Sequence, residues 1–201
     1  MTIVEDRLLA GQEAARKAMI DSQLRTSGIN AEWVLRRMSE VAREDFVPTA
    51  ARGFAYIDRA IDLGGGLRLG PPVVQGMMLQ EARPTQSDKA LLIDGGSGYL
   101  AELLRPLVGS LEVATPAEAL GKVRKADNFT LLLIDGAIEV LPDSLVRHLA
   151  EEARVVTGWV EQGITRLAVG RKAAGAVALL ALAELGIPLL PEFAAPKSWS
   201  F

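Results

Sequence analysis

The stretch Leu91-Leu92-Ile93-Asp94-Gly95-Gly96-Ser97-Gly98-Tyr99 decides the fold class of this chain. Its apolar first part, from Ala90 to Ile93, predicts a buried strand, and the glycines after it predict a tight turn that opens a helix. Such a turn lets a ligand approach the backbone closely, and the following helix N-terminus offers N–H groups to an anion. Because tight strand-to-helix turns also need glycine for geometry alone, a nucleotide site and a purely structural turn both stay open.

After Pro84 the chain alternates between short apolar runs and amphipathic segments. The runs predict strands over Ala90–Ile93, Leu111–Ala114, Leu131–Ile134, Arg154–Thr157 and Thr165–Val169. The segments between and after them predict helices over Tyr99–Leu107, Ala117–Lys125, Asp143–Glu151 and Ala173–Glu184. The runs are continuously apolar, which is typical of strands covered by helices on both faces. We therefore expect an α/β fold with a mostly parallel, doubly wound sheet.

The N-terminal part of the chain has a different pattern. Apolar residues recur at three- and four-residue spacings from Thr2 to Met38, which predicts helices. Residues 54–75 are rich in glycine and proline and predict a long loop, which can be functional or a plain connector. We expect residues 1–84 to form a helical extension with this loop, packed on a core of residues 85–201 within one structural unit.

Composition excludes several classes of function. The 201 residues carry a formal net charge of −3, so the basic surface of a nucleic-acid-binding protein is missing. The chain has no cysteine and one histidine, which argues against thiol chemistry and a metal site. The N-terminus does not fit a secretory signal, and the longest apolar stretch, Ala173 to Leu182, is too short to span a bilayer. We expect a cytoplasmic protein without a membrane span.

Several short segments, taken in order, resemble those of the protein-L-isoaspartate (D-aspartate) O-methyltransferase family. They are Gln23-Leu24 with Gly28-Ile29, Arg43-Glu44-Asp45-Phe46-Val47-Pro48, Ala55-Tyr56-Ile57-Asp58, Pro72-Val73-Val74 and Gly96-Ser97-Gly98-Tyr99. The likeness continues through Phe129–Asp135 and 136–142 to Ile187-Pro188-Leu189-Leu190. The order and spacing of the segments are more specific than any one of them.

This resemblance implies a Rossmann-like methyltransferase core, S-adenosylmethionine as cofactor, and methyl transfer to an isoaspartyl carboxylate in damaged protein. It implies cofactor-binding residues at Asp94, Gly95, Gly96, Ser97, Gly98, Tyr99, Thr115 and Asp135, and a substrate loop with Tyr56, Asp58, Arg68, Leu69, Gly70 and Pro72. Asp135 is expected nearest the transferred methyl. A carboxylate attacks a sulfonium methyl in line, so positioning and exclusion of water provide most of the rate.

The chain departs from the family pattern at four places. Asp94 stands where the first glycine of the motif is usual, with Leu92 in place of an acidic residue. Thr115 follows the second strand, where an acidic residue usually binds the ribose. Only about fifteen residues lie between Ala114 and Leu131, so the family's third strand is expected to be missing. Gly70 stands where the substrate loop usually has a hydroxyl, and Arg68 is the nearest alternative partner for an anion.

Three hypotheses follow from this pattern. The first is an isoaspartyl methyltransferase with an unusual pocket. The second is a degenerate member that keeps the fold as a binding or interaction module without catalysis. The third is a methyltransferase for another acceptor, which tolerates Gly70 but still requires the cofactor.

Overall fold

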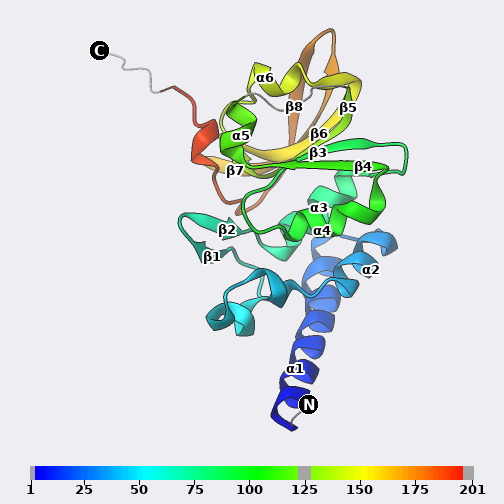
Figure 1. The fold of residues 1–201 in the computed structure, drawn as a ribbon, viewed down its shortest axis with the longest axis vertical. Helices are drawn as coiled ribbons and strands as arrows, with labels where there is room; N and C mark the ends of the chain where they lie inside the picture. Colours follow the sequence, from blue (N-terminus) through cyan, green and yellow to red (C-terminus); the bar gives the residue numbers. More distant parts are fainter. Residues whose placement is uncertain (1–2, 122–127, 197–201) are drawn as a thin grey trace.

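The computed structural model describes residues 3–121 and 128–196 and is built on one six-stranded sheet (Figure 1). The strand order is β4-β3-β5-β6-β7-β8. β4, β3, β5 and β6 are parallel to one another, and β7 and β8 continue the sheet as antiparallel strands. The bounds are β3 Lys89–Ile93, β4 Ser110–Ala114, β5 Phe129–Ile138, β6 Leu149–Glu161, β7 Ile164–Ala173 and β8 Ala176–Glu184.

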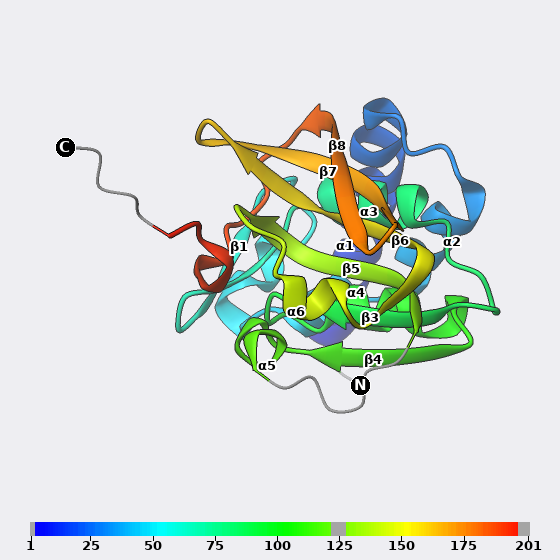
Figure 2. The same cartoon turned by 90° about the horizontal axis from the view of Figure 1, so that it is seen from above.

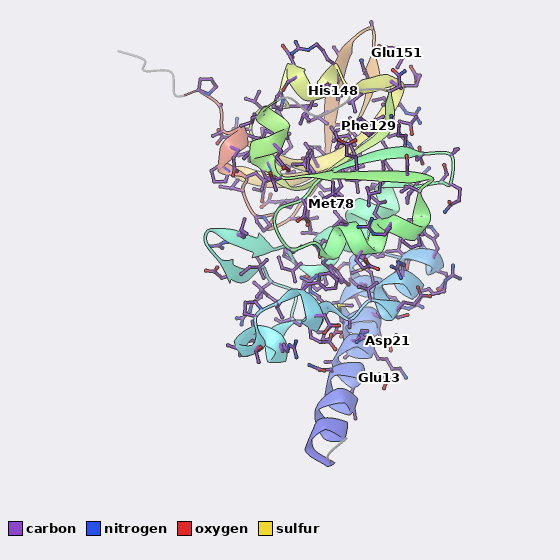
Figure 3. The ribbon with its side chains drawn as sticks, in the orientation of Figure 1. Glu13, Asp21, Met78, Phe129, His148 and Glu151 are labelled. Atoms are coloured by element: carbon purple, nitrogen blue, oxygen red, sulfur yellow. The ribbon has the colours of Figure 1, made fainter. Side chains whose placement is uncertain are left out.

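Helices cover both faces of this sheet (Figures 1 and 2). One face carries α3 (Pro72–Ala82) and α4 (Tyr99–Leu104), with α2 (Glu32–Glu40) packed on α3 and α1 (Ile3–Met19) extending away from the sheet. The other face carries α5 (Pro116–Leu120) and α6 (Asp143–Val146). Alternate residues of the central strands serve the two cores: Leu92 and Leu133 pack on the first face, and Leu91 and Leu132 on the second. Figure 3 shows Met78 in the first core and Phe129 in the second. The expected Rossmann-like fold is confirmed.

The C-terminal helix expected over Ala173–Glu184 is wrong, because this segment forms the edge strand β8. A two-residue turn at Ala174 and Gly175, with φ of 50° and 80°, reverses the chain after β7 and pairs β8 with it. A run of alanine and leucine has high helix propensity and no clear period. Pairing with β7 overrides that propensity.

The helix expected over Asp143–Glu151 is wrong in its second half. α6 ends at Val146, and β6 begins at Leu149, opposite Phe129 of β5. The helix expected over Ala117–Lys125 corresponds to α5, which ends at Leu120, and residues 122–127 lie outside the described part of the chain. The helix expected over Tyr99–Leu107 ends as α4 at Leu104 and continues as a 3₁₀ turn, Arg105–Leu107.

The expected loop over residues 54–75 contains a small hairpin before α3. Its strands are β1 (Ile61–Gly64) and β2 (Leu67–Leu69), and positive φ angles at Gly64, Gly65 and Gly66 make the turn. Besides α1 and α2, the chain before this hairpin contains short helical turns. They are a π-helical turn at Ile20–Leu24 and 3₁₀ turns at Arg25–Ser27, Arg43–Phe46 and Thr49–Phe54. A last 3₁₀ turn spans Pro191–Phe193. Glycine thus supplies a folded hairpin here and not an irregular connector.

Between β4 and β5 the described residues form only α5, and β4 is the edge of the sheet. No described helix is both long and apolar enough to cross a bilayer. The division into residues 1–84 and 85–201 stays a prediction.

Candidate functional site

The glycine turn after β3 is held by the side chain of Asp94. The Asp94 carboxylate accepts hydrogen bonds from the backbone N–H of Gly96 at 3.0 Å and of Gly98 at 3.1 Å. Both glycines have positive φ, 107° and 73°, which disfavours other residues there. Burial raises the pKa of Asp94, and the two N–H groups act in the opposite direction. The expected turn is present, and its own carboxylate occupies two of its donors.

Asp135 lies beside this turn because β5 has a bulge. Ile134 pairs with Thr157 and Ala137 with the next residue, Gly158, so Asp135 and Gly136 are extra residues in β5. A bulge of this kind redirects a side chain out of the regular ladder. A Cβ on Gly95 would overlap the Asp135 carbonyl oxygen, so the turn and the bulge pack with their backbones in contact.

The carboxyl group of Asp135 is buried in polar surroundings. Its Oδ2 accepts a hydrogen bond from Gln75 Nε2 of α3 at 3.2 Å, and the residue is 7% exposed. Burial raises the pKa of Asp135 to about 7 together with the nearby charge of Asp94, while Gln75 and Arg43 act in the opposite direction. Asp135 is therefore a carboxyl group that changes its protonation state near neutral pH.

Arg43, from the 3₁₀ turn Arg43–Phe46, organises the centre of the site. Its guanidinium is fully buried and donates to Ala55 O at 2.7 Å, to Gln75 Oε1 at 2.6 Å and to Gly70 O. It also lies 4.9 Å from the centroid of the Tyr99 ring. Burial lowers the pKa of Arg43, whereas Tyr99 and Asp135 act in the opposite direction.

Arg43 and Gln75 were not among the expected site residues. A single polar side chain between Val74 and Gly76 in an apolar helix signals a buried hydrogen bond, and Gln75 could have been found in this way. Arg43 has no comparable signal, because its partners are mostly backbone carbonyls of distant segments.

The structure brings part of the expected substrate loop into the site. A Cβ placed on Gly70 would lie 3.9 Å from Asp135 Oδ1, so Gly70 faces this carboxyl group. Leu69 and Pro72 are buried beside it in sequence, and Arg68 is exposed on β2. Leu67 of the same hairpin lies against Gly96, where an added Cβ would be 2.8 Å from its Cδ2.

Tyr56 and Asp58 have structural partners instead. The Tyr56 hydroxyl donates to Glu44 and accepts from Arg16 Nε at 2.7 Å. Asp58 accepts from the backbone N–H of Val73 at 3.2 Å, at the start of α3. These contacts hold the loop on the helices.

The remaining expected cofactor residues are also engaged locally. Thr115 is the N-cap of α5 in a capping box with Glu118, and it is exposed at the sheet edge. Ser97 Oγ accepts from the backbone N–H of Tyr99 at 3.2 Å. The described residues contain no cluster of acidic or histidine side chains suited to a metal ion.

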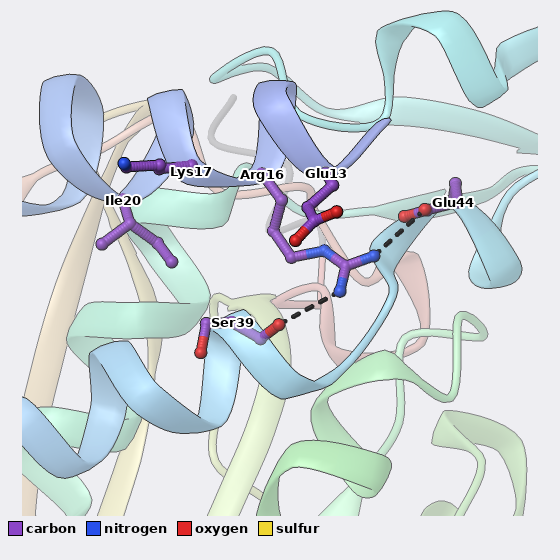
Figure 4. A pocket seen from close by; sticks show the side chains of 6 residues that line it. All are labelled: Glu13, Arg16, Lys17, Ile20, Ser39 and Glu44. Atoms are coloured by element: carbon purple, nitrogen blue, oxygen red, sulfur yellow. Dashed lines mark hydrogen bonds and ion pairs between the residues drawn. The ribbon is translucent and has the colours of Figure 1, made fainter. Parts of the chain in front are cut away.

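A separate cavity of about 480 Å³ lies between α1 with the turn after it and the end of α2 with the turn after that helix (Figure 4). Arg16 crosses it and donates to Ser39 O at 3.1 Å and to Glu44 Oε1 at 3.1 Å. Its lining is Glu13, Arg16, Lys17, Ile20, Ser39 and Glu44. This lining includes none of the residues of the turn or of the bulge.

Comparison with solved structures identifies the fold. The fold is similar to that of a chain from Plasmodium falciparum, described as a protein-L-isoaspartate O-methyltransferase in complex with S-adenosyl-L-homocysteine, with a TM-score of 0.71 and 16% identity. The match covers 90% of this chain and 98% of that one. The fold is thus the Rossmann-like fold of S-adenosylmethionine-dependent methyltransferases.

Sequence comparison then identifies the family. The family model of protein-L-isoaspartate(D-aspartate) O-methyltransferase matches residues 14–118. A protein-L-isoaspartate O-methyltransferase from Koribacter versatilis is 31% identical over 191 residues, covering 83% of this chain and 86% of that protein. One from Anaeromyxobacter is 30% identical over 181 residues, covering 78% and 74%. The chain belongs to the protein-L-isoaspartate(D-aspartate) O-methyltransferase family.

Proposed function

We propose that this chain binds S-adenosylmethionine at the turn of residues 94–99 and transfers its methyl group to the isoaspartyl carboxylate of damaged protein. The observation that carries the proposal is the juxtaposition of the glycine turn after β3 with Asp135 in the bulge of β5. In open α/β sheets, ligands bind at the carboxyl ends of neighbouring strands. Family membership and the S-adenosyl-L-homocysteine bound by the Plasmodium chain support the same assignment.

The charges of the site suit the cationic part of this cofactor. S-adenosylmethionine carries a sulfonium and an ammonium group, and Asp94 offers a half-buried carboxylate at the turn. The carboxylate of the cofactor cannot use the N–H groups of Gly96 and Gly98, because these groups already donate to Asp94. Residues 94–98 would therefore hold the cofactor through close backbone approach and through the Asp94 charge. The bound cofactor would supply an electrophilic methyl group.

The residues of this chain would act by positioning. Arg43 and Gln75 fix the orientation of Asp135 and of the Gly70 backbone. Leu67 of the β1–β2 hairpin lies against Gly96 and places an apolar side chain beside the turn. Correct placement of two reactants and exclusion of water are the main demands of methyl transfer between a carboxylate and a sulfonium.

Asp94 also favours the alternative of a fold kept for binding without catalysis. Its carboxylate fills the donors of the turn, and Leu67 rests on Gly96, so the turn is stable without a ligand. In that case the chain would bind neither S-adenosylmethionine nor its product at millimolar concentration.

Calorimetric titration of the purified chain with S-adenosylmethionine and S-adenosyl-L-homocysteine separates the two. We expect saturable binding of both, with the sulfonium compound preferred. In Asp94→Asn this preference should fall roughly five- to thirtyfold, the effect of losing about 1–2 kcal/mol of charge attraction. The matched control is Asp143→Asn, which changes an exposed acidic residue at the start of α6, outside the turn and the bulge. It should leave both affinities unchanged.

A methylation assay completes the test. An isoaspartyl peptide should become methylated, whereas the same peptide with a normal aspartyl residue should not. Cofactor binding without methylation of the isoaspartyl peptide would point to another acceptor, the third hypothesis of the sequence. Absence of binding by both compounds would leave only the non-catalytic module.

A further inference from the structure

Asp135 has one oxygen engaged and one free. Oδ2 accepts the hydrogen bond from Gln75, whereas among the described residues none donates to Oδ1. Oδ1 is also the oxygen that faces Gly70, at 3.9 Å from the position of an added Cβ. Oδ1 is thus a buried oxygen without a hydrogen-bond donor in the described part of the chain, at a place where residue 70 contributes no side chain.

The charged groups that face Asp135 are Asp94, which follows β3, and Arg43, which lies in the 3₁₀ turn Arg43–Phe46. Arg43 is committed to three acceptors, none of which is Asp135. Burial and Asp94 together raise the pKa of Asp135 to about 7. Below neutral pH the side chain is therefore a neutral acid with an O–H group to donate, as documented for buried carboxyl groups elsewhere.

We propose that Asp135, in its protonated form, is a substrate-binding residue that donates a hydrogen bond from Oδ1 to the acceptor carboxylate. The proposal rests on the proposed function and names how that site selects its substrate. A hydrogen bond from an acid to a carboxylate is short and strong. An ionised Asp135 would lack this donor and would place a third negative charge beside Asp94 and the acceptor.

The charge balance of the occupied site favours the neutral form. With Asp135 protonated, the negative charges of Asp94 and the acceptor face the positive charges of the sulfonium and of Arg43. Ionising Asp135 would leave one negative charge unbalanced in a buried place. Binding of the acceptor and protonation of Asp135 should therefore support each other.

The test is calorimetric binding of an isoaspartyl peptide to the chain saturated with S-adenosyl-L-homocysteine, between pH 6 and pH 9. For the wild type we expect affinity to fall above about pH 7, approaching tenfold per pH unit. Asp135→Asn keeps a hydrogen-bond donor that does not titrate, so its affinity should stay constant with pH. Asp135→Leu has no donor and should bind at least tenfold more weakly at pH 6, while Asp143→Asn should follow the wild type.

Circular dichroism shows whether each variant is folded. If Asp135→Asn does not fold, Asp135→Ser takes its place as a variant with a smaller donor that does not titrate. Identical pH profiles for the wild type and the donor variant would overturn the inference, as would no loss of affinity in Asp135→Leu. Complete absence of peptide binding would overturn it too. Peptide binding with the expected pH profile but without methyl transfer would instead contradict only the proposed function.

Discussion

Asp94 follows β3 and Asp135 lies in the bulge of the neighbouring parallel strand β5, yet their surroundings give them different properties. Burial raises the pKa of Asp94, and the two backbone N–H groups that it binds act in the opposite direction. Asp135 is buried, receives one hydrogen bond and faces the charge of Asp94. Two carboxyl groups whose environments separate their pKa values can take separate roles in one site. In the proposed site, Asp94 would face a cation and Asp135 a carboxylate.

The raised pKa of Asp135 has a consequence for stability. The pKa is about 7 in the folded chain and about 3.9 in an unfolded one, so the folded state retains its proton over this interval. The contribution of protonated Asp135 to the free energy of unfolding is fully present below about pH 4 and is lost as pH rises through 7. Asparagine does not titrate, so Asp135→Asn should not show this loss. The loss amounts to about 1.4 kcal/mol for each unit by which the folded and unfolded pKa values of Asp135 differ. Urea unfolding at pH 4, 5.5 and 7 should show the variant gaining on the wild type; a constant difference would contradict the assignment.

The two tyrosines form a matched pair for a second prediction. The Tyr56 hydroxyl links Arg16 and Glu44, whereas the buried Tyr99 hydroxyl lies beside Arg43 and donates to no acceptor in the described part of the chain. Tyr56→Phe should lower the free energy of unfolding by about 1–3 kcal/mol, since it removes the hydrogen bond to Glu44 and the one from Arg16. Tyr99→Phe should be neutral or stabilising. Equal losses in urea denaturation of the two variants would show that Tyr99 has a partner in solution.

At the scale of elements, the bulge in β5 and the β7–β8 hairpin shape the molecule. The bulge sends Asp135 to the glycine turn, where a regular strand would continue the ladder. The hairpin converts a segment with helical composition into an edge strand. In each case one or two residues outside the regular pattern determine the path of the element.

The hairpin turn offers a stabilising substitution. Ala174 has a φ of 50°, which is costly for a residue with a Cβ, and Gly175 follows at 80°. Ala174→Asn creates the Asn-Gly pair that such two-residue turns prefer, and it should raise stability by up to about 1 kcal/mol. Gly175→Ala should lower stability by a similar amount. Thermal unfolding followed by circular dichroism measures both, and opposite signs are required.

At the scale of the whole molecule, the N-terminal helices and the sheet share one core. Val34 and Met38 of α2 belong to the same cluster as Leu92 and Val156 of the sheet. Arg154 of β6 donates to Ala82 O and Arg83 O at the end of α3 and pairs with Asp88 at 2.5 Å. The shared cluster and the two hydrogen bonds from Arg154 to the end of α3 cross the expected boundary at residue 84, whereas the ion pair with Asp88 lies within residues 85–201.

Two tryptophans report on the two sides of that boundary. Trp33 is in α2 and Trp159 in β6. Variants that keep only one of them, with the others replaced by phenylalanine, should show coincident urea transitions, because a shared core unfolds as one unit. An earlier transition reported by Trp33 would make residues 1–84 an independently unfolding domain.

The sequence by itself determined the central strands and the glycine turn. Continuous apolar runs such as Leu131–Ile134 are expected wherever both faces of a strand are buried, and the left-handed angles at Gly96 and Gly98 require glycine. The order of motifs also determined the family. These features depend on local residue chemistry, which a sequence contains in full.

Only the tertiary structure decided the state of β8 and the composition of the site. β8 is a strand because β7 lies beside it, not because of its own propensity. Arg43, Gln75, Gly70 and Asp135 meet because the hairpin, α3 and the bulge of β5 converge on the turn at Asp94. The protonation of Asp135 depends on burial and on a charge from another strand, and both are properties of the folded chain alone.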